Sequence, residues 1–242
     1  MAIEFTGATA QYLGFDTVPT ATNLAQKSIC FWATFDADNI GGNGRSVVSK
    51  FTEIPSANGW YVSTFPTKIL LFARKLSSEA NATYWTSPDN TYVYGEWNHY
   101  AITYDSSTIT NNALIYKNGG SITFSYPFGA PSGTVTSDAS LNLVIGNTNE
   151  YLYTHDGREQ DIRIYNRILT PAEVYALYAN RRIGYMRNGL VFHAPAIGAA
   201  GCTKFDGTTL GATNYVYDII NNAAGTPVGN PVGAGNTIQR IN

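Results

Sequence analysis

The fold is decided by the stretch Asp161-Ile162-Arg163-Ile164-Tyr165-Asn166-Arg167-Ile168-Leu169-Thr170-Pro171-Ala172-Glu173-Val174. Its first part alternates: Ile162 and Ile164 are apolar, and the residues between them are polar or amphipathic. This period of two is typical of a strand with one buried face. Asn166-Arg167 interrupts the alternation and predicts a turn.

The second part of the same stretch has the signals of a helix start. Thr170 supplies a side-chain oxygen for an N-cap, Pro171 suits the first helical position, and Glu173 completes a capping box. The pattern predicts a helix from about Pro171 to Arg182, which is the one convincing helix in the chain.

Outside this stretch the composition favours strands and turns. Only 13% of the 242 residues are charged, and the chain carries 17 Tyr and 23 Gly. Short β-prone segments recur from Ile3 to Ile145, about a dozen in all at a spacing of roughly 8–15 residues. This spacing indicates a β-sandwich.

Charge and hydropathy exclude several classes of protein. A net charge of −2 argues against binding nucleic acid through its phosphates. No apolar run is long enough for a membrane span, so we expect no membrane insertion. The first residues, Met1 to Thr6, have no basic or apolar leader pattern, so we expect synthesis in a cytoplasm without a cleaved signal. Cys30 lies in an apolar strand and is expected to be a small buried residue; a bridge to Cys202 stays open.

Six short motifs occur in one order along residues 3–182. The motifs are Ser28 to Trp32, Gly95 to His99, Tyr104-Asp105, Ile115 to Gly119, Ile145-Gly146 and the opening stretch. Together they resemble the laminin-G-like form of the concanavalin A-like jelly roll, which implies an all-β antiparallel sandwich with one short flanking helix. The resemblance also implies that Trp32 and Trp97 are buried.

The same resemblance divides the chain. Residues 1–186 correspond to the jelly roll, and residues 187–242 form a C-terminal extension or arm rich in Gly, Ala, Asn and Thr. Residues 189–195 and 218–227 are similar to the lead-in of such a domain, displaced to the end. We therefore expect the extension to lie along its own sandwich, or along a neighbour's, as an added strand.

The sequence argues against catalysis. Glycosidases of this fold use a Glu-x-Asp-x-x-Glu strand, whose two carboxylates share the chemistry. Glu159-Gln160-Asp161 approaches that pattern, but Ile164 stands at the position of the second Glu. The three histidines, His99, His155 and His193, are scattered and match no catalytic or zinc spacing. The chain is therefore predicted not to be an enzyme.

A loop between two late strands carries oxygen ligands suited to calcium. These candidates are Asn147, Asn149, Glu150 and Asp156, although a solvated loop explains them equally well. Family members often open with Phe-Asp-Gly followed by acids, whereas residues 5–9 here lack acids, which counts against the family's usual calcium site. No other cofactor is expected.

Three aromatic residues are candidates for stacking on sugar rings: Trp60, Trp85 and Tyr151. Packing in the core or at its rim is the alternative for each of them.

The resemblance implies a non-catalytic structural or binding protein, of the kind that bacteriophage virions use for capsid decoration, fibres or adhesion. On this interpretation the protein is made in the host cytoplasm and lies on the surface of a virion or particle. It would form a homo-oligomer or contact other virion proteins through residues 189–242, and would take a surface glycan as ligand. A free-standing lectin-like protein is the alternative, and a glycoside hydrolase a distant third.

Overall fold

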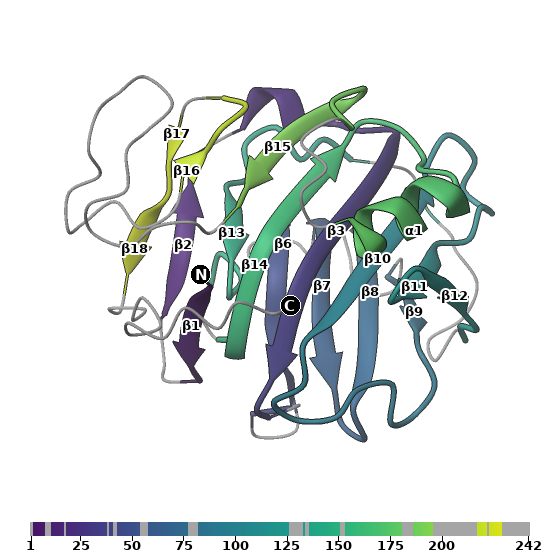
Figure 1. The fold of residues 1–242 in the computed structure, drawn as a ribbon. Helices are drawn as coiled ribbons and strands as arrows, with labels where there is room; N and C mark the ends of the chain where they lie inside the picture. The colour runs from purple at the N-terminus through teal and green to yellow at the C-terminus, as the bar shows by residue number, and fades with distance from the viewer. Residues whose placement is uncertain are drawn as a thin grey trace.

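Two antiparallel sheets stack face to face in a computed structural model of the chain (Figure 1). The structure describes residues 2–7, 11–16, 18–37, 39–40, 43–53, 58–76, 82–125, 133, 136–150, 153–180, 186–195, 217–221 and 223–228. Within them the fold is nearly all β, which confirms the predicted jelly-roll sandwich with one short α-helix.

The front sheet in Figure 1 has seven strands. Its order is β1 (Ile3–Thr6), β14 (Asp156–Tyr165), β3 (Gln26–Phe35), β10 (Asn98–Asp105), β11 (Leu114–Lys117) and β12 (Gly120–Ile122), with β15 (Leu190–Ala194) also paired to β14. The Asn118-Gly119 turn joins β11 to β12 with positive φ at both residues, as this hairpin type requires.

The back sheet also has seven strands. Its order is β18 (Thr226–Val228), β2 (Tyr12–Phe15), β13 (Leu143–Ile145), β6 (Ser46–Thr52), β7 (Asn58–Phe65), β8 (Ile69–Leu76) and β9 (Thr83–Thr86). Two small ladders complete the strands, β4 (Asn39–Ile40) with β5 (Asn43–Gly44), and β16 (Tyr217–Asp218) with β17 (Ala223–Ala224). A 3-10 helix, η1 (Pro19–Ala21), precedes β3.

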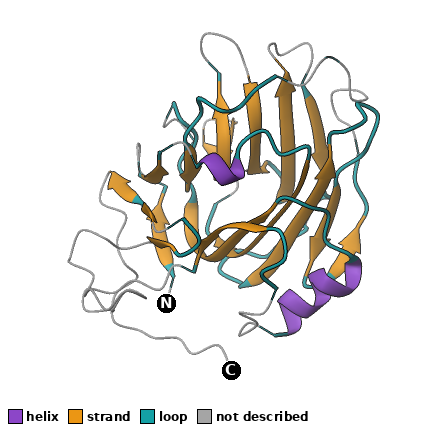
Figure 2. Ribbon diagram, turned by 90° about the horizontal axis from the view of Figure 1, so that it is seen from above, coloured by secondary structure: helices purple, strands orange, loops and turns teal. Residues whose placement is uncertain are grey.

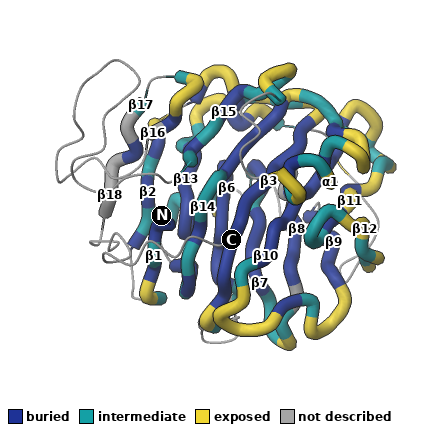
Figure 3. Tube along the Cα trace, viewed as in Figure 1, coloured by how far each residue is buried: buried dark blue, intermediate teal, exposed yellow. Residues whose placement is uncertain are grey.

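The core fills the space between the sheets. On β3 the alternate residues Ile29, Phe31 and Phe35 are fully buried, and Val62 and Phe72 face them from the back sheet. Figure 3 shows the strands of both sheets buried along most of their length, with exposure concentrated in the loops. Burying each such side chain contributes about 1.5–3 kcal/mol, so this double row of apolar residues is the main source of stability.

Helix α1 (Pro171–Ala179) lies outside the sandwich, as the view from above shows (Figure 2). Leu169, Val174 and Leu177 pack on a second apolar cluster that includes Cys30 and Tyr165 on the outer face of the front sheet. Burial raises the pKa of the Cys30 thiol to about 12, so Cys30 is a small buried residue, as predicted. At nine residues, α1 is too short to cross a membrane, and no longer helix occurs in the part of the chain that the structure describes.

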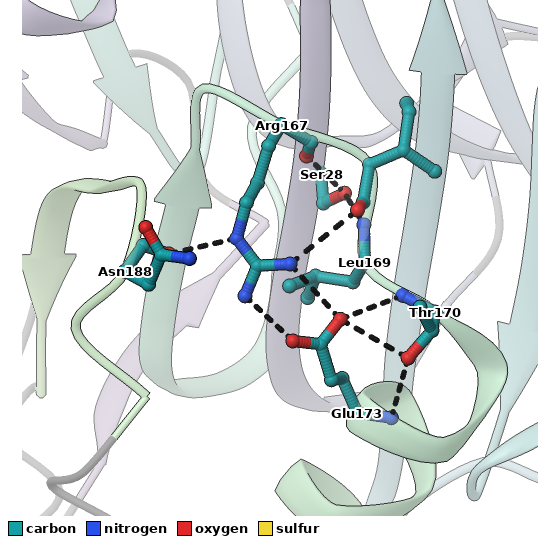
Figure 4. Close-up of polar contacts among 7 residues, drawn as sticks. Ser28, Arg167, Leu169, Thr170, Glu173 and Asn188 are labelled. Carbon is teal, nitrogen blue, oxygen red and sulfur yellow. Dashed lines mark hydrogen bonds and ion pairs between the residues drawn. The ribbon is translucent and has the colours of Figure 1, made fainter.

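The predicted capping box is present at the start of α1 (Figure 4). The Thr170 hydroxyl accepts the backbone N–H of Glu173 at 3.3 Å, and the Glu173 carboxylate accepts the N–H of Thr170 at 2.8 Å. Arg167 donates to both Glu173 oxygens at 2.7 and 2.9 Å, and this hydrogen-bonded pair lowers the pKa of Glu173 to about 2. Ser28 accepts from Leu169 N and donates to Arg167 O, which ties the turn to β3.

The described parts of the C-terminal extension lie on their own sandwich. Strand β15 pairs with the second half of β14, where it continues the position that β1 occupies beside the first half. Strand β18 pairs with β2 at the edge of the back sheet. Phe192 and Ala194 of β15 are buried in the main core. Strands β15 and β18 thus each add to one of the two sheets, and β15 shares the jelly roll's core.

A short segment anchors the extension beyond β15. Asp218 is fully buried and accepts the backbone N–H groups of His193 and Ile220, each at 3.0 Å. Ile219 N donates to His193 O at 2.9 Å. Asn221 Nδ2 donates to Val191 O at 2.9 Å. Residues 217–221 are therefore fixed against β15. Residues 196–216 and 229–242, which were also predicted to make subunit contacts, lie outside the described residues.

One expectation about burial is only half met. Trp32 is 3% exposed, as predicted. Trp97 is partly exposed, because it precedes the first residue of β10 and so lies in the loop that enters the strand.

Candidate ligand pocket

A pocket of about 350 Å³ opens at the end of the sandwich where β3 and β7 begin and β8 and β10 end. Five separate segments line it: residues 23–27, residues 58–60, Phe72 with Arg74, Tyr104 with Ser106, and residues 136–138. The volume falls in the lower part of the range for small-molecule sites, about 300–1,000 Å³.

The strand registers explain why these side chains meet. Lys27 pairs with Tyr104 across β3 and β10, and Trp60 pairs with Arg74 across β7 and β8. Lys27 is two residues before Ile29 on the inner face of β3, and Arg74 is two residues after Phe72 on β8. Because strand side chains alternate, all four residues point into the sandwich. The pocket is therefore the open end of the core.

Its apolar walls are aromatic. Trp60, Phe72 and Tyr104 all line the pocket, and the rings of Phe72 and Tyr104 lie 5.6 Å apart. The Trp60 side chain is largely buried, yet its indole N–H has no hydrogen-bond partner among the described residues.

Arg74 is the most unusual polar residue of the pocket. It is 6% exposed, and its Nη1 donates to the Tyr104 hydroxyl. Its Nε and Nη2 have no hydrogen-bond partner in the described part of the chain. Leaving buried charged donors without partners costs stability, about 1–3 kcal/mol or more for each group. The arrangement therefore resembles a site that a ligand completes.

Lys27 is the second cation of the pocket. Its Nζ lies 5.4 Å from the centroid of the Tyr104 ring. Burial lowers the pKa of Lys27 to about 8; the charge of Arg74 lowers it further, while Asp138 and Asp105 raise it. The ammonium group is thus present at neutral pH but has lost much of its hydration.

Asp138 is the one carboxylate among the described residues that line the pocket. Its Oδ1 accepts the N–H of Asn23 at 2.7 Å, and its own N–H donates to Asn23 Oδ1 at 3.0 Å. Asn58 donates to Ser137 O at 2.7 Å and so holds the neighbouring part of the rim. Two cations and one carboxylate leave the pocket with one excess positive charge.

The predicted sugar-binding residues have different positions. Trp60 lines the pocket. Trp85 does not: it is fully buried, and its ring lies 5.7 Å from Phe72 and 5.0 Å from Tyr104. Trp85 therefore has no face open to a sugar, which corrects the expectation that it stacks on one. Tyr151 lies outside the described residues.

The prediction from sequence did not include Arg74, Lys27 or Tyr104. The sequence did contain a sign of the two cations. Lys27 and Arg74 each occupy an inward-facing position of an alternating strand, where an apolar residue is usual.

The predicted calcium ligands mostly bind the protein itself. Asn147 is buried, and its Oδ1 accepts the N–H groups of Thr148 and Tyr153 at 2.8 and 2.9 Å. Its Nδ2 donates to Thr154 Oγ1 at 2.8 Å. Asn149 Nδ2 donates to Phe51 O at 2.6 Å. These amides hold the loop against the back sheet.

Glu150 and Asp156 lie near opposite ends of β6. Glu150 Oε1 accepts from Thr52 Oγ1 at 2.8 Å, whereas Asp156 Oδ2 lies 3.7 Å from Nη2 of Arg45, which precedes β6. The seven residue steps from Arg45 to Thr52 span about 23 Å of strand, while calcium ligands lie about 2.3–2.6 Å from the ion. The structure therefore does not bring the four predicted ligands together. Among the described residues no three His, Cys, Asp or Glu side chains gather at a metal-binding distance.

The residues considered for catalysis form two separate pairs and one single histidine, not one cluster. Glu159 is fully buried between the sheets, and its Oε1 is 3.8 Å from His155 Nε2. Burial raises the pKa of Glu159 well above its ordinary value, and burial lowers the pKa of His155 to about 3. On β15, His193 Nε2 lies 2.7 Å from Asp161 Oδ1, and on β10 the ring of His99 packs 5.4 Å from that of Trp32.

Comparisons with known proteins agree with this fold. Curated protein sequences give no significant match. A putative carbohydrate binding protein from Bacteroides ovatus has a TM-score of 0.60 at 15% identity, over 93% of this chain and 57% of that one. A heptameric pentraxin from Limulus polyphemus has a TM-score of 0.54 at 15% identity, over 78% of this chain and 89% of that one.

A third similar structure is the CBM40 of the Ruminococcus gnavus IT-sialidase, bound to α2,3-sialyllactose, with a TM-score of 0.54 at 14% identity over 73% of this chain and 96% of that one. Identities this low show a common fold. The sequence profile of the concanavalin A-like lectin/glucanase superfamily, in its laminin-G form, matches residues 7–175. With its two stacked sheets and this match over most of its length, the chain belongs to the concanavalin A-like lectin/glucanase superfamily.

Proposed function

We propose that this protein is a non-catalytic, glycan-binding jelly-roll domain and that the pocket at the end of the sandwich is its sugar site. The observation that carries the proposal is the pocket itself, because aromatic walls meet buried donors that have no partner among the described residues. Two structures with the same fold support it, the putative carbohydrate binding protein and the CBM40 bound to sialyllactose.

The chemistry of the pocket suits a sugar. The C–H faces of a pyranose pack on aromatic rings such as those of Trp60 and Tyr104. Ring and hydroxyl oxygens can accept from the free N–H groups of Arg74 and Trp60. A few fixed polar groups in an otherwise apolar pocket are the usual arrangement for orienting a small ligand.

Hydrolysis has little support. Two-carboxylate hydrolysis needs both groups to reach the glycosidic bond. Glu159 lies in the core without exposure, and the buried Ile164 stands at the position of the second Glu in the glycosidase pattern. Among the described residues that line the pocket, Asp138 is the one carboxylate, and it is held by Asn23.

A glycan array, followed by calorimetry on the hits, tests the proposal. Ser137→Trp places a large side chain on the exposed rim of the pocket and should abolish binding. Ser121→Trp on the exposed part of β12 is the matched control and should bind normally. Absence of any glycan hit, or full binding by Ser137→Trp, would contradict the proposal.

Assembly on a virion stays a proposal from the sequence resemblance. In its favour is the length of sequence that follows the family match at residues 7–175. Light scattering on the purified protein tests it, and a stable monomer that binds no particle would argue against it.

A further inference from the structure

We infer that the pocket binds the carboxylate of an acidic sugar, such as a uronic or sialic acid, through the side of the Arg74 guanidinium that has no hydrogen-bond partner among the described residues. This inference rests on the proposed function and specifies its ligand class.

The free side of Arg74 has the geometry that a carboxylate needs. Nη1 is already used by the Tyr104 hydroxyl, which leaves Nε and Nη2 without partners among the described residues. These two nitrogens share one edge of the guanidinium and donate two parallel hydrogen bonds, which match the two oxygens of a carboxylate.

The same chain shows this edge in use elsewhere. Arg163 Nε donates to Asp161 Oδ1 at 2.8 Å, and Arg163 Nη2 donates to Asp161 Oδ2 at 3.0 Å. Arg163 is as buried as Arg74, at 5% and 6% exposure. One buried arginine thus has its carboxylate within the protein. The other lines the pocket, and the same edge of its guanidinium has no partner among the described residues.

The remaining polar groups of the pocket favour an anion over a neutral ligand. The orphaned atoms on its lining are all donors: Nε and Nη2 of Arg74 and Nε1 of Trp60. A neutral sugar hydroxyl brings a donor with every acceptor, whereas a carboxylate brings acceptors alone. Lys27 adds a second positive charge beside the Tyr104 ring, and Asp138 offsets only one of the two cations.

The aromatic walls indicate what carries the carboxylate. Phe72, Trp60 and Tyr104 would contact an apolar ring face while the acid group meets Arg74. A volume of about 350 Å³ suits a single sugar residue better than a long chain.

Calorimetry with matched ligand pairs on the unaltered protein tests the inference. The pairs are glucuronate with glucose, and N-acetylneuraminic acid with its methyl ester. Loss of a charge-assisted bidentate contact should weaken binding about 10- to 100-fold, so the acid should bind that much more tightly than its neutral partner.

Arg74→Lys keeps the positive charge but removes the two parallel N–H donors of the guanidinium. It should reduce the preference for the acid, while the weak binding of the neutral sugar should stay the same. Arg158→Lys, at a partly exposed arginine on β14 paired with Glu4, is the matched control and should leave the preference unchanged. If Arg74→Lys fails to fold, the ligand pairs on the unaltered protein still decide.

The outcomes separate the two proposals. Equal affinity for acid and neutral partners would overturn the inference but leave glycan binding intact. Tighter binding of a sulfated sugar than of the carboxylated one would also overturn it. No binding of any glycan would overturn the proposed function itself.

Discussion

Replacing Glu159 with Gln should change how the stability of the protein depends on pH. Glu159 pairs with Ala33 and Ile3 across the front sheet and points into the core, and neither carboxyl oxygen has a hydrogen-bond partner among the described residues. Burial raises its pKa well above 4.5, so the folded protein keeps this carboxyl neutral. In the unfolded chain the Glu159 carboxyl is ionised once the pH rises above about 4.5. The free energy of unfolding then falls by up to about 1.4 kcal/mol per pH unit, until the pH reaches the folded-state pKa.

His155 changes the stability in the opposite direction, over a lower range of pH. Its pKa is about 3 in the folded protein against an ordinary value of 6.5. Between these values the unfolded chain binds a proton that the folded protein does not, so stability rises with pH. From pH 4.5 to 6.5 the contributions of His155 and Glu159 oppose each other. Above 6.5 the contribution of His155 no longer changes with pH.

Urea unfolding of the unaltered protein and of Glu159→Gln, across this pH range, measures the effect. Contributions from other groups cancel in the difference between the two proteins. The stability of the variant relative to the unaltered protein should increase with pH from about 4.5 upward, with a slope of up to about 1.4 kcal/mol per unit. If the curves of unfolding free energy against pH ran parallel for the two proteins, the reasoning would be refuted. Glu159 would then be ionised in the folded protein, as it would be if His155 beside it were protonated.

Three further predictions concern packing, the extension and the pocket. Gly146→Ala should cost about 2–4 kcal/mol in urea unfolding, because φ is +79° and the added Cβ would lie 2.3 Å from Phe5 Cζ. Gly95→Ala, at φ +75° with nothing within 4 Å, should cost only about 1 kcal/mol. Asp218→Ala should cost about 1–3 kcal/mol and speed proteolysis of the C-terminal segment, since two backbone N–H groups lose their acceptor; an unchanged cleavage rate would contradict this. Binding of an acidic sugar should weaken as pH rises through about 8, because Lys27, which faces Arg74, Tyr104, Asp105 and Asp138, then loses its charge. Lys27→Met should remove that pH dependence in calorimetry.

Local patterns in the sequence predicted the scaffold well. The alternation of Ile29, Phe31 and Phe35 places one face of β3 in the core, and the capping box at Thr170 places the start of α1. These features depend on near neighbours in the chain, which is why periodicity and spacing are sufficient to predict them.

The pocket could not be predicted in the same way. Lys27, Trp60, Arg74 and Tyr104 come from four strands in two sheets, and only the registers bring them together. Trp60 and Trp85 have similar local surroundings in sequence, but β9 packs Trp85 against Phe72 and Tyr104.

The four expected calcium ligands illustrate the opposite error, in which residues close in sequence lie far apart in the fold. Glu150 and Asp156 are six residues apart in sequence, but their partners Thr52 and Arg45 lie near opposite ends of β6. Nearness in sequence therefore did not give nearness in space.

The shared edge of β14 bears on how the chain could be reconnected. Strand β15 ends at Ala194 opposite Ile162, and β1 begins at Ile3 opposite Glu159, so the two run in the same direction along β14 like one strand cut in two. The cut lies at the bulge around Asp161, where about two residues of strand, ~7 Å, separate the two segments. A shortened, circularly permuted variant that joins residue 195 to residue 2 through a few residues, and so omits residues 196–242, should therefore keep this edge of the front sheet intact. Its new ends could be opened in the exposed turn at Ser107-Thr108.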